Sequence, residues 1–90
     1  MKEAWIKALR FAALPGAAKV RFEARSGDGA RHYRLRSFSP AGHVMGDGRD
    51  YELLKAVMTP LEKLADSEDN EDLNLELDLI STVITRTITE

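Results

Sequence analysis

The sequence predicts a small α+β fold in which two helices pack on one face of a small antiparallel sheet. Three observations lead to this prediction. Two segments, 3–14 and 51–65, repeat apolar residues at helical spacing. Three others, 19–25, 30–38 and 73–89, have the alternation or the β-branched composition of strands. Turn residues separate these segments, so the expected order is αββ(β)αβ with a long bent C-terminal strand.

The first helix is expected to run from Glu3 to Leu14, with its apolar residues on one side and its cations on the other. Pro15 pushes Leu14 out of helical geometry, and Gly16 supplies the turn that follows. Trp5 lies on the apolar side. We therefore expect its indole to anchor the core.

A hairpin is expected next, because apolar and charged side chains alternate along 19–25 and again along 30–38. The loop Ser26-Gly27-Asp28-Gly29 joins the two strands, and its glycines allow a positive φ. A short third strand is expected at 43–45.

The second helix is expected to be capped by Asp47 or Asp50 and to bury an apolar face that extends to Ala65. Thr59-Pro60 resembles the start of a helix, since proline is favoured in a first turn. The sequence therefore predicts a kink or a restart at Thr59.

The C-terminal run 73–89 is the longest extended segment. Four leucines alternate with polar residues up to Leu79, and the isoleucines that follow occupy the opposite phase. Either a bulge near Ile80 returns them to the leucine face, or the strand continues and buries its other side. A straight strand would span about 55 Å, whereas a compact chain of this length is about 30 Å across.

A tight hairpin is not favoured, since no Gly, Asn-Gly or Pro lies near residues 80–82. We therefore expect a bent strand whose far end pairs with a second chain. Ile84 and Ile88 are the candidate self-association residues, and a homodimer would result.

Ninety residues predict a single domain, 1–90. The absence of cysteine excludes disulfides, zinc–thiolate sites and thiol catalysis. We recognise no catalytic set, metal site, cofactor motif, signal peptide or membrane span. The expectation is a cytoplasmic protein that is no enzyme, uses no cofactor and has no membrane partner.

Charge divides the chain into a basic front and an acidic back. Residues 1–49 hold ten Lys/Arg and four Asp/Glu, whereas residues 50–90 hold three and eleven. The segment 66–72, DSEDNED, is an acidic connector between the second helix and the C-terminal run. It does not match the calcium-binding loop of an EF-hand, because that loop requires glycine at its sixth position. We expect this connector to face a basic protein partner, through Asp66, Glu68, Asp69, Glu71 and Asp72.

The basic hairpin offers an alternative, since its outward arginines could bind a polyanion such as nucleic acid. The candidate residues are Arg21, Arg25, Arg34 and Arg36. No outward aromatic is expected that could stack on bases. The opposing interpretation is that Glu76 and Asp78 lie beside these arginines and cancel their field.

The order of the elements resembles the small cytosolic immunity proteins of bacterial polymorphic toxin systems, and also phage-encoded inhibitors of similar build. The segments that carry the resemblance are a Trp-bearing first helix, KVRFEA, HYRLRSF, DYELLKAVMTPLEKL and LNLELDL. Those immunity proteins tend to close with two strands joined by a Gly turn. The resemblance implies stoichiometric binding to a toxin or effector, without turnover.

Three functions follow as expectations. The first is a non-enzymatic protein-binding module of the immunity or inhibitor type. The second is a nucleic-acid-binding accessory protein that uses the hairpin 19–36. The third is a structural homo-oligomer assembled through the C-terminal strand.

Overall fold

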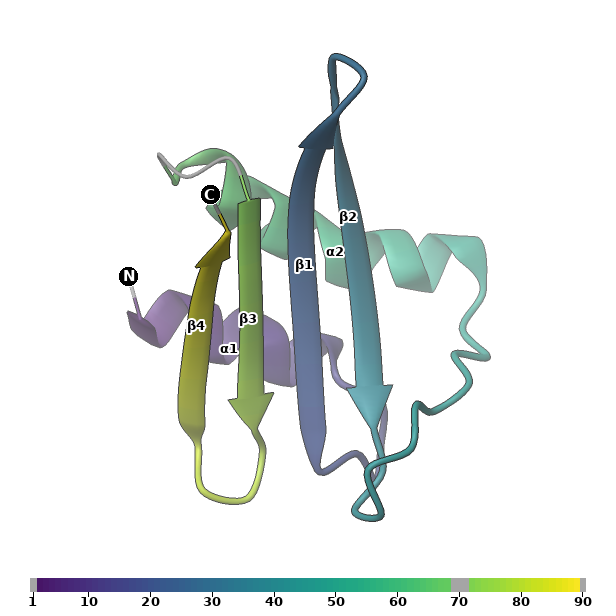
Figure 1. The fold of residues 1–90 in the computed structure, drawn as a ribbon. Helices are drawn as coiled ribbons and strands as arrows, with labels where there is room; N and C mark the ends of the chain where they lie inside the picture. Colours follow the sequence, from purple (N-terminus) through teal and green to yellow (C-terminus); the bar gives the residue numbers. More distant parts are fainter. Residues whose placement is uncertain (1, 69–71, 90) are drawn as a thin grey trace.

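The computed structural model describes residues 2–68 and 72–89, with residues 86–89 described by their backbone alone. This part of the chain forms two helices and four strands, and Figure 1 shows how they are arranged. Their bounds are α1 (Lys2–Ala12), β1 (Lys19–Gly27), β2 (Ala30–Phe38), α2 (Tyr51–Asp66), β3 (Asp72–Asp78) and β4 (Val83–Thr89).

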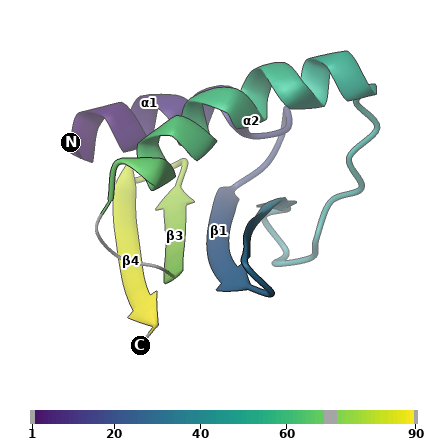
Figure 2. The same cartoon turned by 90° about the horizontal axis from the view of Figure 1, so that it is seen from above.

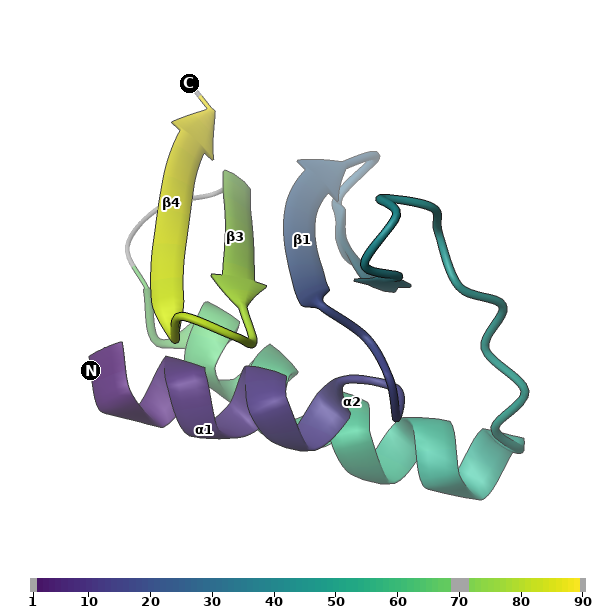
Figure 3. The same cartoon turned by 90° about the horizontal axis from the view of Figure 1, so that it is seen from below.

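The strands form one antiparallel sheet in the order β2-β1-β3-β4. Both helices lie on the same face of it, side by side and running in roughly opposite directions (Figures 2 and 3). The other face has no helix over it. The expected α+β class, with two helices on one face of an antiparallel sheet, is therefore confirmed.

The core lies between the helices and the central strands. Alternate residues of β1 and β3 point to the helices, and Phe22 and Leu75 are paired across these two strands. Trp5 is 3% exposed, and its ring centroid lies 5.9 Å from that of Phe22, so it anchors the core as expected. The buried apolar residues are Trp5, Ala8, Leu9, Ala12, Val20, Phe22, Ala24, Val57, Leu61, Ala65, Leu73, Leu75 and Leu77.

The β1–β2 hairpin closes at Asp28 and Gly29, where φ is 52° and 76°. Two successive positive φ values are typical of a type I′ turn, whose twist matches that of the strands. The hairpin predicted over 26–29 is therefore confirmed.

Helix α2 is continuous from Tyr51 to Asp66, with Pro60 inside it. Of the predicted kink or restart at Thr59, the restart is therefore wrong, and the kink stays a prediction. The Thr59 hydroxyl donates instead to the Lys55 carbonyl at 2.8 Å, as helical Thr residues do. Of the two predicted caps, Asp50 is the N-cap, and its carboxylate accepts a hydrogen bond from the Leu53 N–H at 2.9 Å.

Asp47 has another role, because it accepts hydrogen bonds from the Arg49 guanidinium at 2.7 and 2.9 Å. Arg49 also donates to the carbonyl of Ala12 at 2.8 Å. This ion pair therefore ties the loop before α2 to the C-terminus of α1.

The predicted third strand at 43–45 is not a strand. The structure has a single bridge there, between Phe38 and Val44, supported by a 2.8 Å hydrogen bond from the Met45 N–H to the Ser37 carbonyl. Val44 is 57% exposed. Because no apolar surface covers Val44, nothing extends the pairing beyond this bridge.

The single bent strand predicted for residues 73–89 is also wrong, because the run folds back on itself as the hairpin β3–β4. The turn needs no glycine. The Asp78 carboxylate accepts hydrogen bonds from the N–H groups of Ile80 (2.9 Å) and Ser81 (3.1 Å), and Thr82 takes a left-handed φ of 60°. The reversal also explains the phase change after Leu79, since Ile84 pairs with Leu77 and packs against the core.

No helix in the described ranges is both long and apolar enough to cross a membrane.

Candidate functional site

The face of the sheet that the helices leave open is polar. The β1–β2 register places Arg21 opposite Arg36, and Glu23 opposite Arg34. The β1–β3 register places Glu76 beside Arg21 and Asn74 beside Glu23. The predicted basic residues Arg21, Arg25, Arg34 and Arg36 thus lie together on the β1–β2 half of this face, with carboxylates among them.

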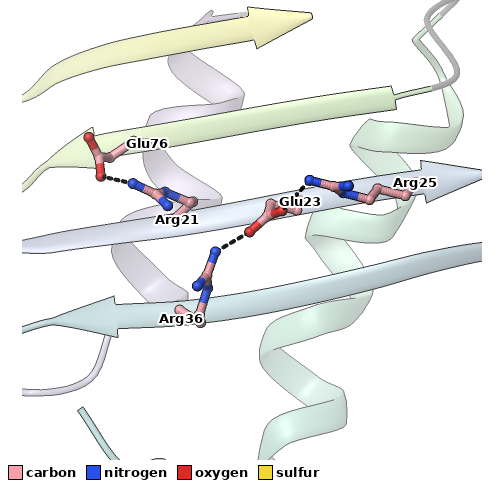
Figure 4. A network of polar contacts seen from close by, with 5 residues as sticks. All are labelled: Arg21, Glu23, Arg25, Arg36 and Glu76. Carbon is pink, nitrogen blue, oxygen red and sulfur yellow. Dashed lines mark hydrogen bonds and ion pairs between the residues drawn. The ribbon is translucent and has the colours of Figure 1, made fainter. Parts of the chain in front are cut away.

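Glu23 is the centre of a polar network on this face (Figure 4). Its two carboxylate oxygens accept hydrogen bonds from Arg36 and, at 3.3 Å, from Arg25. The residue is only 7% exposed, although no helix covers it, because these neighbours surround it. One carboxylate thereby neutralises part of the charge of two of the four candidate arginines.

Burial raises the pKa of Glu23, but the hydrogen bonds and positive charges of Arg36 and Arg25 outweigh it. The net result is a pKa below the ordinary value of 4.5. Glu23 is therefore ionised at neutral pH, which is the state in which it holds both arginines.

Arg21 is held by a second carboxylate. Its guanidinium lies 3.0 Å from the Glu76 carboxylate, and both side chains are about one third exposed, at 32% and 29% (Figure 4). Glu76 therefore does cancel charge on the hairpin. Asp78 instead holds the β3–β4 turn, and the backbone hydrogen bonds from Ser81 and Ile80 lower its pKa.

The open face does carry an aromatic ring, contrary to the expectation. Phe38 lies under two cations, with the guanidinium carbons of Arg21 and Arg36 at 5.1 Å and 5.7 Å from its ring centroid. Arg34, by contrast, is exposed and makes no ion pair with any residue in the described ranges. One free arginine of four is a weak footprint for nucleic acid.

The described carboxylates of the acidic connector, those of Asp66, Glu68 and Asp72, accept hydrogen bonds within the domain. Asp66 accepts a 2.6 Å hydrogen bond from the Tyr33 hydroxyl and lies 3.6 Å from the Arg31 guanidinium. That hydrogen bond, together with burial and the carboxylate charge, raises the pKa of Tyr33.

Two more residues of the connector have intramolecular roles. Glu68 accepts a hydrogen bond from the Trp5 indole at 3.2 Å, and Asp72 accepts one from the Ser26 N–H at 3.0 Å. Asp69 and Glu71 lie outside the described residues. The three described acids thus fasten the end of α2 and the start of β3 to the sheet and to α1.

A groove of about 790 Å³ lies between α1 and α2. Its walls are almost entirely apolar. Small side chains create it, since Ala4, Ala8 and Pro60 leave room where longer residues would fill the space between the helices. The lining residues are Glu3, Ala4, Ile6, Lys7, Ala8, Arg10, Phe11, Pro60, Lys63 and Leu64.

Phe11 and the cations set the chemistry of this groove. The Phe11 side chain is an exposed aromatic in the groove wall, 62% accessible to solvent. Lys7 and Lys63, one on each helix, are exposed and have no ion-pair partner within ranges 2–68 and 72–89. Arg10 donates a 3.1 Å hydrogen bond to the neutral Thr82 hydroxyl, so its charge is not cancelled.

The candidate self-association residues are placed differently from one another. Ile84 is half-buried against the core, so its side chain is not free for a partner. The side chain of Ile88 lies outside the described part of the chain. The backbone of β4 is nevertheless at the edge of the sheet.

Within the described ranges, no three His, Asp or Glu side chains gather where they could hold a metal ion. His32 and His43 lie on separate elements, His32 on β2 and His43 in the loop after it.

The sequence analysis did not identify the groove. One signal was available, because Phe11 lies two positions from Leu9 and outside the apolar side formed by Trp5, Leu9 and Ala12. The small residues Ala4 and Ala8 gave none, since their effect depends on how α2 packs beside α1.

In the comparisons with known proteins, no family model matches this chain, and neither a curated protein nor a solved structure is significantly similar to it.

Proposed function

We propose that this chain is a non-enzymatic protein-binding module that binds a toxin or effector protein stoichiometrically and blocks it. The observation that carries the proposal is the apolar groove between α1 and α2, with an exposed Phe11 and with Lys7 and Lys63, which form no ion pair among the described residues. Monomeric proteins seldom leave such a surface open, and an exposed aromatic near a groove is typical of a protein interface.

The β3–β4 hairpin gives additional support. The immunity proteins that the sequence resembles tend to close with two strands joined by a Gly turn, and this chain also ends in two strands, although its turn has Thr82 and not Gly at the left-handed position. The proposed partner-binding surface differs from the acidic connector, whose described carboxylates are engaged within the domain.

The test is co-expression with the protein encoded beside it in the source genome. We expect a complex with one copy of each chain by native mass spectrometry. We also expect the activity of the partner to fall in proportion to added chain and to stop at one equivalent. Two outcomes would overturn the proposal: a neighbour that remains fully active, or a purified chain that retains nucleic acid but no protein.

The β4 edge favours a second candidate, a homo-oligomer assembled by strand pairing. Edge strands offer unpaired N–H and C=O groups, and Val83 at the start of β4 is 56% exposed. Light scattering decides this candidate, since a mass of one chain at high concentration excludes it.

A further inference from the structure

The residues that line the groove between α1 and α2 indicate what kind of molecule can bind there. Its apolar lining includes Ala4, Ala8, Pro60 and Leu64, whose side chains offer no hydrogen-bond donor that could orient a polar ligand. The lysines Lys7 and Lys63 stand on the two helices that form its sides. An occupant must therefore present an apolar stripe with negative charge beside it.

We infer that the groove binds an amphipathic α-helix of a partner protein whose apolar stripe is flanked by Asp or Glu residues. This inference rests on the proposed function and names the kind of segment that the partner inserts.

A helix is the shape that the groove accommodates. Two neighbouring helices leave a furrow between them, and the side-chain ridges of a third helix pack into it. Helix α1 has 11 residues, which corresponds to about 16 Å. A partner helix of three turns, with apolar side chains at positions i, i+4 and i+7, would cover this length, placing one side chain over Ala4 and Ala8 and another against Phe11.

The charge of the rim selects an acidic helix. The groove is lined by three cations, Lys7, Arg10 and Lys63, and by one carboxylate, Glu3, which leaves a balance of +2. The arginines on the open sheet face differ, because Arg21, Arg25 and Arg36 are held by Glu76 and Glu23. Carboxylates on both sides of the partner stripe would meet Lys7 and Lys63.

Two other occupants fit less well. A membrane surface would cover the mouth of this groove without filling it, whereas a helix can enter it. A second copy that placed its own groove here by twofold symmetry would bring together two grooves that each carry a balance of +2.

Two helical peptides of about 12 residues test the inference. They share one leucine stripe, and the flanking positions carry Glu in the first peptide and Lys in the second. Fluorescence anisotropy measures binding to the full chain at low and high salt. We expect the Glu peptide to bind with a Kd below about 1 mM, at least tenfold tighter than the Lys peptide, and several-fold more weakly at high salt.

Variants at exposed positions keep the domain folded while they change the groove. Ala4→Trp places a large side chain in the groove lining and should abolish binding of the Glu peptide. The double variant Lys7→Glu with Lys63→Glu should reverse the preference, so that the Lys peptide binds more tightly. Lys55→Glu, an exposed position on α2 that does not line the groove, is the matched control and should bind as the wild type does.

Equal binding of the two peptides, or no binding of either, would overturn the inference. Stronger binding to vesicles of phosphatidylglycerol than to the Glu peptide would do the same. The proposed function, stoichiometric binding of a partner protein, can hold even if the groove does not bind a helix. If the protein partner forms its complex equally well with wild type and Ala4→Trp, the chain is a binding module that uses a different surface.

Discussion

The guanidinium of Arg21 on β1 lies 3.0 Å from the carboxylate of Glu76 on β3, on the face of the sheet that no helix covers. Together with Glu23, which holds Arg25 and Arg36, this pair removes much of the positive field of the basic hairpin. Each exposed pair contributes little to stability, but the cancelled charge decides what the face can bind.

Removal of the Glu76 charge, which neutralises Arg21, should allow the open face of the sheet to bind a polyanion. We expect the wild-type chain to pass through a heparin column at physiological salt, and Glu76→Gln to be retained, because Arg21 then loses its counter-charge. Glu52→Gln, an exposed carboxylate on α2, is the control with the same change in net charge and should elute with the wild type. Strong retention of the wild type would contradict the neutralisation and favour the nucleic-acid alternative.

Glu23 should make stability depend on acid pH. Its folded pKa lies below 4.5, so the carboxylate contributes stability above that value, and the contribution is lost as pH falls through the folded pKa. Glu23→Gln should lower the free energy of unfolding by about 1–3 kcal/mol at pH 7. Urea unfolding measured from neutral to acid pH should show a flatter profile for the variant, and parallel profiles would contradict the role assigned to Glu23.

A substitution in the β3–β4 turn should increase the stability of the domain. Thr82 has a φ of 60°, which is costly for a β-branched residue and well tolerated by Asn. Thr82→Asn should therefore raise the free energy of unfolding by up to about 1 kcal/mol. Asp78→Ala should lower it, because the N–H groups of Ile80 and Ser81 lose their acceptor. Thermal unfolding of both variants gives the signs, and a stabilising Asp78→Ala would contradict this description of the turn.

The two large aromatic residues of α1 should behave oppositely. Trp5 is 3% exposed and Phe11 is 62% exposed. Trp5→Ala should cost about 3–5 kcal/mol of stability, since it opens a cavity at the centre of the core. Phe11→Ala should change stability by less than about 0.5 kcal/mol. Chemical denaturation followed by circular dichroism measures both, and a large loss for Phe11→Ala would mean that this residue serves the fold.

The sequence was sufficient for the elements that depend on local pattern. The alternation around Phe22 and around Leu75 placed both strands on the core face, and the glycine-containing loop 26–29 gave the first hairpin. Asp50 was among the expected caps of α2.

The second hairpin was missed because its turn uses an acceptor side chain in place of glycine. Asp78 was interpreted as a strand residue facing arginines, whereas its carboxylate holds two backbone N–H groups of the turn. The neutralising role of Glu23 was not predicted either, because the carboxylates expected beside the arginines were Glu76 and Asp78 on the C-terminal strand. The groove depends on how α1 and α2 pack, which no local pattern records.

A protein partner that occupies the groove between α1 and α2 must change the surroundings of both helices. Amide chemical-shift mapping of the isotope-labelled chain, alone and in complex with its partner, measures that change residue by residue. We predict that the largest shifts fall on residues 4–11 and 60–64, and that the strands β1 and β2 change little. Shifts confined to the Arg34 side of the sheet or to Asp66 and Glu68, with α1 unchanged, would contradict it.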